Sequence, residues 1–161
     1  DYSNDALKNF LHQGEIRGFL EYAVQAKKNI IVSGGTSTGK TTFLNATLRA
    51  IPMEERIITV EDAREVMLPH PNRVHLLASK ACLRLRPDRI IVGELRGAEA
   101  FSFLRAINTG HPGSIATLHA DTPALAFEQL TLMVLQAVLG LERDQIQDYI
   151  HKVVDIVVQL K

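Results

Sequence analysis

The sequence predicts an α/β fold in which a mainly parallel sheet is flanked by helices. Short apolar runs alternate along the chain with segments whose apolar residues recur at helical spacing, as in parallel sheets with crossover helices. Three of these runs are followed within two positions by glycines or acidic residues, at 34–35, 61–62 and 93–94. Because ligands of open α/β sheets bind outside the carboxyl ends of the strands, these positions are the first candidates for a functional site.

The elements follow in order from the apolar spacing. Residues 3–26 predict helical structure that is capped at Ser3 or Asn4 and broken at Gly14 and Gly18. Strands are predicted over 30–32, 56–60, 74–77, 89–92, 114–118 and 156–160, and helices over 42–48, 81–86, 99–109, 122–139 and 144–150. We therefore divide the chain into an N-terminal helical segment or linker, 1–28, and a main domain, 29–161.

The predicted helix over 81–86 is too short for its place in the chain. It has six residues before Pro87, whereas a crossover between parallel strands needs about a dozen or more. We therefore expect that residues are missing from the sequence between Lys80 and Ala81. In that case these two residues are not true neighbours.

The bulk composition is that of one globular domain. The chain has 161 residues, of which 46% are hydrophobic and 22% charged, enough for one sizeable core. Its 18 basic and 18 acidic residues balance, so nucleic acid is not indicated as a direct ligand. The single cysteine, Cys82, excludes an internal disulfide. We expect no transmembrane segment, because the longest nearly apolar run, 131–141, is too short to span a bilayer.

The stretch after the first predicted strand is a phosphate-binding pattern. It reads Gly-x-x-x-x-Gly-Lys-Thr and lies between a predicted strand and a predicted helix. The residues expected to hold the nucleotide are Gly34, Gly35, Thr36, Ser37, Thr38, Gly39, Lys40, Thr41 and Thr42. Glycines let backbone N–H groups approach the phosphates, and the N-terminus of the following helix favours an anion. Lys40 would place its charge between the last two phosphates, and the Thr41 hydroxyl would hold Mg²⁺.

Side chains at the ends of the later strands complete the predicted site. They are Glu61, Asp62, Glu94, Arg96 and His119. Because the carboxyl ends of parallel strands share one edge, we expect these groups to lie near Lys40. Glu94 is predicted to be a metal-site residue together with Thr41, beside the attacking water. His119 is predicted to sense the γ-phosphate.

Two carboxylates are candidates for activating the water. In an in-line attack on the γ-phosphate, Lys40 and Mg²⁺ would neutralise the developing charge. Glu61 or Glu94 would orient or deprotonate the water, and the other would help to hold magnesium through a bridging water. The sequence leaves this choice open.

Four motifs in this order resemble the secretion ATPases of type II secretion, type IV pili and type IV secretion. They are the phosphate loop 34–41, the acidic box 59–62, the strand end 93–96, and the histidine box 110–114 with 117–120. The amino-acid sequences of 84–89 and 93–97 are similar to those of the type IV secretion and conjugation branch. The resemblance covers the chain from about Lys28 onward. It implies a RecA-like P-loop NTPase domain that hydrolyses ATP.

The same resemblance implies a homo-oligomeric ring, usually a hexamer, at the cytoplasmic face of the inner membrane, with other subunits of the secretion apparatus as partners. Family members carry an N-terminal domain that closes over the nucleotide, so we expect this chain to correspond to the C-terminal nucleotide-binding domain alone. The family also has a longer segment around Lys80 and Ala81. Arg84, Arg86 and Arg96 resemble family arginines near subunit contacts and nucleotide.

Three other functions are compatible with a phosphate loop. A small-molecule kinase would need an acceptor pocket and a lid, and no lid segment is evident in the sequence. A module that binds nucleotide without turnover is disfavoured because Lys40 and Glu94 are both present. A DNA motor is disfavoured by the zero net charge. ATP hydrolysis that powers type IV secretion is therefore the expected function.

Overall fold

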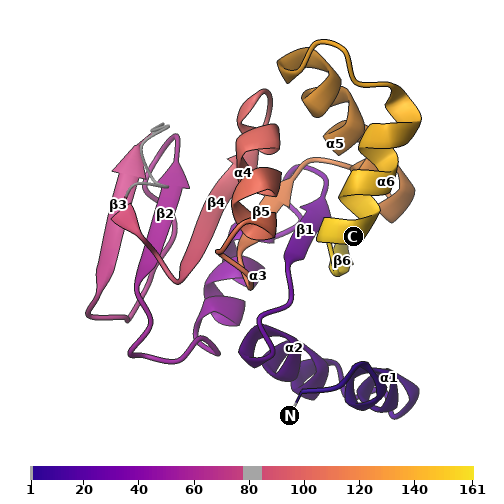
Figure 1. The fold of residues 1–161 in the computed structure, drawn as a ribbon. Coiled ribbons are helices and arrows are strands. Elements are labelled where there is room, and N and C mark those ends of the chain that lie inside the picture. Colours follow the sequence, from indigo (N-terminus) through magenta and orange to yellow (C-terminus); the bar gives the residue numbers. More distant parts are fainter. Residues whose placement is uncertain (1, 78–84) are drawn as a thin grey trace.

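The computed structural model describes residues 2–77 and 85–161, and its central feature is a six-stranded sheet in which every pairing is parallel. The strands are β1 (Ile30–Gly34), β2 (Ile57–Glu61), β3 (Arg73–Leu77), β4 (Arg89–Leu95), β5 (Ile115–Leu118) and β6 (Ile156–Leu160). They lie in the order β3-β2-β4-β5-β1-β6 (Figure 1). The predicted α/β class and all six predicted strands are confirmed.

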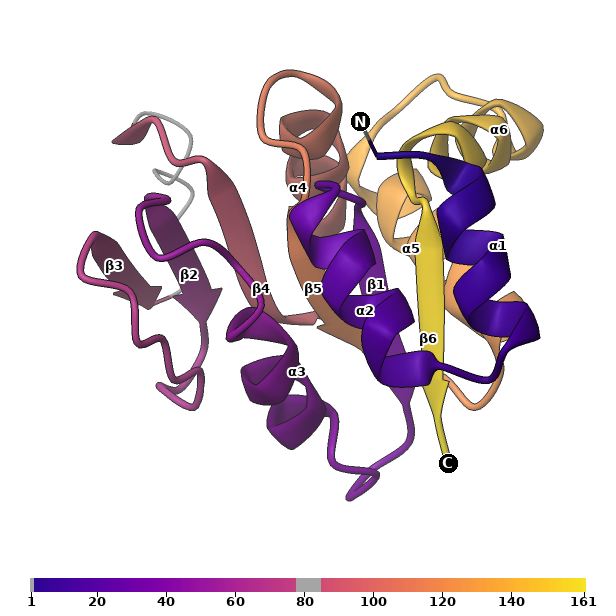
Figure 2. The same ribbon diagram turned by 90° about the horizontal axis from the view of Figure 1, so that it is seen from below.

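In the described residues, six helices cover the two faces of this sheet. They are α1 (Asn4–His12), α2 (Ile16–Gln25), α3 (Lys40–Leu48), α4 (Glu99–Asn108), α5 (Pro123–Ala137) and α6 (Arg143–Val153). The first three lie on one face and the last three on the other (Figure 2). The cap predicted at Ser3 is confirmed, because its side chain accepts from Ala6 N–H. Thr122 caps α5 in the same way, by accepting from Leu125 N–H.

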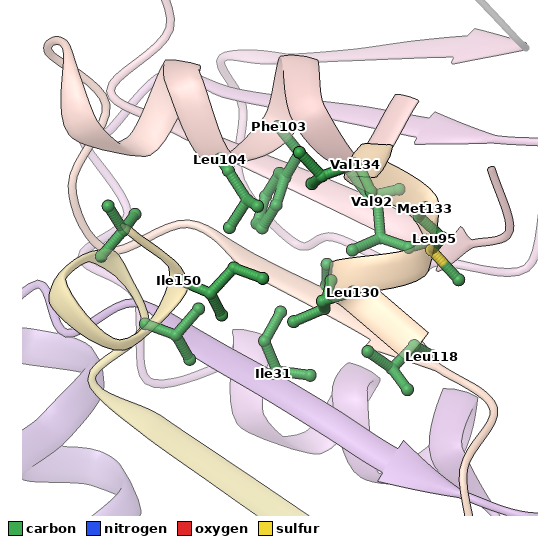
Figure 3. Close-up of a cluster of buried hydrophobic side chains, with 14 of the residues drawn as sticks. Ile31, Val92, Leu95, Phe103, Leu104, Leu118, Leu130, Met133, Val134 and Ile150 are labelled. Atoms are coloured by element: carbon green, nitrogen blue, oxygen red, sulfur yellow. The ribbon is translucent and has the colours of Figure 1, made fainter. Parts of the chain in front are cut away.

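Two apolar cores follow from the alternation of side chains along the buried strands. In β1, Ile30 and Val32 belong to the core under α1, α2 and α3, whereas Ile31 belongs to the core under α4, α5 and α6. Figure 3 shows the second of these cores, where Ile31 lies among side chains of β4, β5 and the three covering helices. The near-continuous apolar runs of the sequence are therefore strands that are buried on both faces.

Some predicted boundaries need correction. The break predicted at Gly18 is wrong, because Gly18 lies inside α2. A Cβ there would meet the Phe10 ring at 2.8 Å, so glycine lets α1 pack closely on α2 and offsets its low helix propensity. Strands β2 and β4 extend further than predicted, to Glu61 and Leu95.

Other predictions stay outside what the structure tests. The junction of Lys80 and Ala81, most of the predicted helix 81–86, and Cys82 lie outside the described residues. The division of the chain at residue 28 also stays a prediction. Within the described ranges, no helix is long and apolar enough to cross a membrane.

Candidate nucleotide-binding site

An open cleft of about 920 Å³ lies at the C-terminal ends of β2, β4 and β5, beside the loop between β1 and α3. Its lining residues come from five segments: Thr36–Thr42; Glu61, Asp62, Ala63, Glu65 and Val66; Gly93, Glu94, Leu95 and Arg96; Thr117 and His119; and Gln129 and Met133 of α5. Every residue predicted as a phosphate-loop or strand-end site residue is in this lining except Gly34 and Gly35, which lie at the base of the phosphate loop. The parallel sheet therefore brings together predicted site residues that are up to 83 positions apart in the chain, from Thr36 to His119.

The phosphate loop folds as its residue types require. Gly39 caps α3 with φ +83°, a left-handed conformation that glycine adopts at little cost. It provides no side-chain cap, so the first N–H groups of α3 remain open toward an anion. The ammonium of Lys40 donates to the carbonyls of Gly34 and Gly35 at 2.9 and 2.8 Å. A positive charge and a helix N-terminus thus face the same cleft.

The segment after β2 is fastened to α3. The amide of Asn45 donates to the Glu65 carbonyl at 3.2 Å and accepts from Met67 N–H at 2.8 Å. The Thr41 hydroxyl lies 3.3 Å from a carboxylate oxygen of Glu65. Glu65 therefore belongs to the site, although the sequence-based set of site residues omitted it. The available signal was its acidic side chain four positions after Glu61.

Glu61 is buried and firmly held. It is only 5% exposed, and its Oε1 accepts from the backbone N–H groups of Glu65 and Val66 at 2.9 and 2.7 Å. Its Oε2 lies 3.4 Å from the Thr59 hydroxyl. Gly93 on the neighbouring strand leaves room for this side chain, since a Cβ there would lie 3.0 Å from Glu61 Cγ. A buried carboxylate with two backbone donors has a fixed orientation.

Glu94 is held differently, by an ion pair at the surface of the cleft. Its Oε2 accepts from two guanidinium nitrogens of Arg96, at 2.7 and 2.5 Å, and Arg96 also bonds Asp62 at 3.0 Å. The hydrogen bond and charge of Glu94 raise the pKa of Arg96, so the guanidinium stays charged. Arg96 thereby joins the acidic residues after β2 to those of β4.

A β-bulge in β4 sets the direction of Glu94. Val92 and Leu95 are three positions apart, yet both lie in the core under α4, α5 and α6, and their register with β5 shifts between them. One extra residue in the strand allows this, and it turns the intervening residues toward the cleft. The buried Thr117 hydroxyl donates to the Gly93 carbonyl within the bulge. Thr117 belongs to the predicted histidine box 117–120, but the sequence assigned it no role, because a bulge leaves no local sequence signal here.

The structure places only some of the predicted basic residues at the cleft. His119 and Arg96 line the cleft. Arg86 is exposed, has φ +48° and does not line the cleft. Arg84 lies outside the described residues.

The oxygen-rich donor set of the cleft fits magnesium. Thr41, Glu65 and Glu94 offer a hydroxyl and two carboxylates, the ligand types that Mg²⁺ prefers. Among the residues described, no group of three or more His, Cys, Asp or Glu side chains is arranged to hold a metal ion. Magnesium in this cleft would therefore take further ligands from phosphate and water.

Comparisons with known proteins agree with this geometry. A family model described as "Type II/IV secretion system protein" matches residues 8–160. The type IV secretion system protein VirB11 of Bartonella henselae is 45% identical over 160 residues, which cover 89% of this chain and 45% of that protein. The VirB11 of Brucella suis is 41% identical over 167 residues, covering 91% of this chain and 46% of that protein.

Solved structures show the same relationship in three dimensions. The crystal structure of the Brucella suis VirB11 ATPase in complex with sulphate superposes with a TM-score of 0.92 and 42% identity, covering 96% of this chain and 51% of that one. The pilus retraction motor PilT with bound ADP gives a TM-score of 0.67 and 26% identity, covering 82% and 41%. The chain thus spans about half the length of these relatives. From the family match over nearly its whole length, we conclude that this chain belongs to the type II/IV secretion system protein family.

Proposed function

We propose that this chain binds ATP with Mg²⁺ and hydrolyses it, as the nucleotide-binding part of a ring-forming ATPase that powers type IV secretion. The observation that carries the proposal is the convergence of Lys40, Thr41, Glu61 and Glu94 on one cleft beside the N-terminus of α3. Phosphoryl transfer is catalysed mainly by positioning and by stabilising charge, and this cleft provides groups for both.

Lys40 and the N–H groups of the phosphate loop would bind the phosphate chain. Lys40 lines the cleft, and its ammonium, which here donates to the carbonyls of Gly34 and Gly35, would exchange these acceptors for phosphate oxygens. Thr41 and Glu94 would hold the magnesium ion, which supplies additional positive charge at the γ-phosphate when bound. His119, exposed in the lining, would contact the γ-phosphate.

The two carboxylates divide the remaining work. Both guanidinium contacts of Arg96 fall on Oε2 of Glu94, so that oxygen is already engaged by two donors. Glu61 has a fixed orientation and, in the described part of the chain, no arginine or lysine ion pair. We therefore assign the orientation of the attacking water to Glu61 and the magnesium contact to Glu94.

The relatives support the wider setting. The Bartonella and Brucella proteins are named as type IV secretion components, and the structurally similar PilT is a pilus retraction motor with ADP bound. By this relationship the present chain would act in a homo-oligomer, a hexamer by family resemblance, located in the cytoplasm and peripheral to the inner membrane. It would work with other subunits of the secretion apparatus, either in substrate transfer or in assembly.

Steady-state release of phosphate from ATP and Mg²⁺ by the full-length protein tests the proposal. Wild-type turnover per subunit should rise with protein concentration if subunits complete the site, and no acceptor should be needed. Lys40→Ala should abolish turnover and weaken nucleotide binding, whereas Lys152→Ala, on the exposed surface of α6, should not. Turnover of Lys40→Ala at the wild-type rate would refute the site, and phosphate release only with an added acceptor would favour a kinase.

A further inference from the structure

His75 on β3 contacts the acidic site from the edge of the sheet. It stands opposite Thr59 in the parallel register of β2 and β3. Its Nδ1 lies 2.7 Å from the Thr59 hydroxyl, which is itself fully buried. The His75 side chain is 14% exposed. The proposed function gives this histidine no role.

The Thr59 hydroxyl is also within reach of Glu61. Both residues point to the same face of β2, and the hydroxyl oxygen lies 3.4 Å from Oε2 of Glu61. Nδ1 of His75 lies 3.9 Å from the same Oε2. Two backbone N–H groups already donate to Oε1. The hydrogen bonding of Oε2 therefore depends on Thr59 and His75.

We propose that His75 and Thr59 act as one positioning unit that controls the hydrogen bonding of Glu61 Oε2 during ATP hydrolysis. The inference rests on the proposed function, in particular on Glu61 as the group that orients the water. Thr59 has a single hydroxyl proton, which can be given to Nδ1 or to Oε2 but not fully to both. The shorter distance to Nδ1 directs the proton to His75 and leaves Oε2 free for water.

The surroundings of His75 favour the neutral ring that this arrangement needs. Burial, and then the charges of Arg64 and Arg73, lower the pKa of His75, while Glu61 acts in the opposite direction. A neutral imidazole can accept a proton at Nδ1, whereas a protonated one cannot. Without the ring, the Thr59 hydroxyl would turn to Glu61 Oε2 and compete with the water.

The test is a kinetic cycle in the full-length protein, with His75→Leu made alone and in a Glu61→Gln background. In the wild-type background, His75→Leu should lower kcat about 10-fold or more, because the carboxylate that orients the attacking water is disturbed, with little change in KM for ATP. In the Glu61→Gln background it should have no further effect on kcat. His75→Gln can still hydrogen-bond Thr59 and should retain most of the wild-type activity. It also tests the inference if His75→Leu folds poorly.

Val74→Ala is the matched control, because Val74 neighbours His75 on β3 but faces the other side of the sheet. It reports any general loosening of the edge strand through the melting temperature. An unchanged kcat for His75→Leu, or an equal loss in both backgrounds, would overturn the inference while leaving ATP hydrolysis in place. A wild-type protein without turnover, or Glu61→Gln at full activity, would overturn the assigned role of the site itself.

Discussion

Replacing Arg89 with Met should destabilise the protein strongly without touching the cleft. Arg89 is fully buried at the start of β4, at the opposite end of the strand from Glu94. Its guanidinium forms two bonds to the Glu55 carboxylate, at 2.7 and 3.0 Å. It also donates to the carbonyls of Val24 and Gly113 at 2.6 and 3.3 Å. One side chain thus fastens α2, the turn before β2 and the turn before β5.

The size of the effect follows from what the substitution leaves behind. Met fills much of the volume but provides no donor, so a largely buried carboxylate and two carbonyls lose their partner. Breaking a buried ion pair by removing one partner costs about 3–5 kcal/mol. For a domain of this size, that corresponds to a fall in melting temperature of about 6–20 °C.

Urea unfolding of wild type, Arg89→Met, Glu55→Gln and the double variant would measure this effect. The double variant should lose less than the sum of the single losses, because neutralising Glu55 removes the charge that Arg89→Met leaves unpaired. Arg89→Lys keeps the charge but not the planar fork, and should fall between wild type and Arg89→Met. A loss below about 1 kcal/mol for Arg89→Met, no larger than an average substitution, would refute the reasoning.

Three further predictions concern the cleft and its surroundings. Glu94→Gln should still bind ATP, but its kcat should fall about 10²-fold, as for other losses of charge stabilisation. Nucleotide-binding titration together with a phosphate-release assay checks this. Hydrolysis at the wild-type rate would leave Glu61 as the only essential carboxylate. Thr117→Val removes the hydrogen bond that holds the β4 bulge and should lower kcat, whereas Thr117→Ser keeps the hydroxyl and should have a kcat near that of wild type. Equal kcat values for the two variants would show that the bond to Gly93 has no catalytic consequence. Stability should fall with decreasing pH below about 6.5, because the folded state lowers the pKa of His75 and the unfolded chain therefore binds the proton first; urea titrations between pH 5 and 7.5 should show a shallower decline for His75→Gln, and an identical decline would contradict the assigned shift.

The phosphate loop illustrates what can be predicted from local sequence. Glycine, lysine and threonine at fixed spacing between an apolar run and a helix are enough to predict the loop, because each residue type has its own backbone or charge requirement there. The structure places all of Thr36–Thr42 in the cleft as expected. The acids after β2 and β4 were also predictable, since a rule about the carboxyl ends of parallel strands needs no knowledge of strand order.

The partners of these acids were not predictable in the same way. Glu61 obtains its two backbone donors from the loop that follows it, and its other carboxylate oxygen lies near Thr59, which contacts a histidine on another strand. Which strand lies beside β2, and in which register, depends on the packing of the whole sheet. The bulge that turns Glu94 depends on the pairing of β4 with β5 for the same reason.

The sequence by itself determined the α/β class, the six strands and most of the charged residues that converge on the cleft beside the phosphate loop. Periodicity and motif spacing encode these features, because they depend on contacts within a few residues along the chain. Tertiary structure alone decided that Arg89 is a buried anchor, that Thr117 fixes a bulge and that His75 reaches the acidic site. Each of these residues contacts segments that are brought together only by strand order and register. Hydrogen bonds between residues far apart in the chain leave no periodic pattern in the sequence.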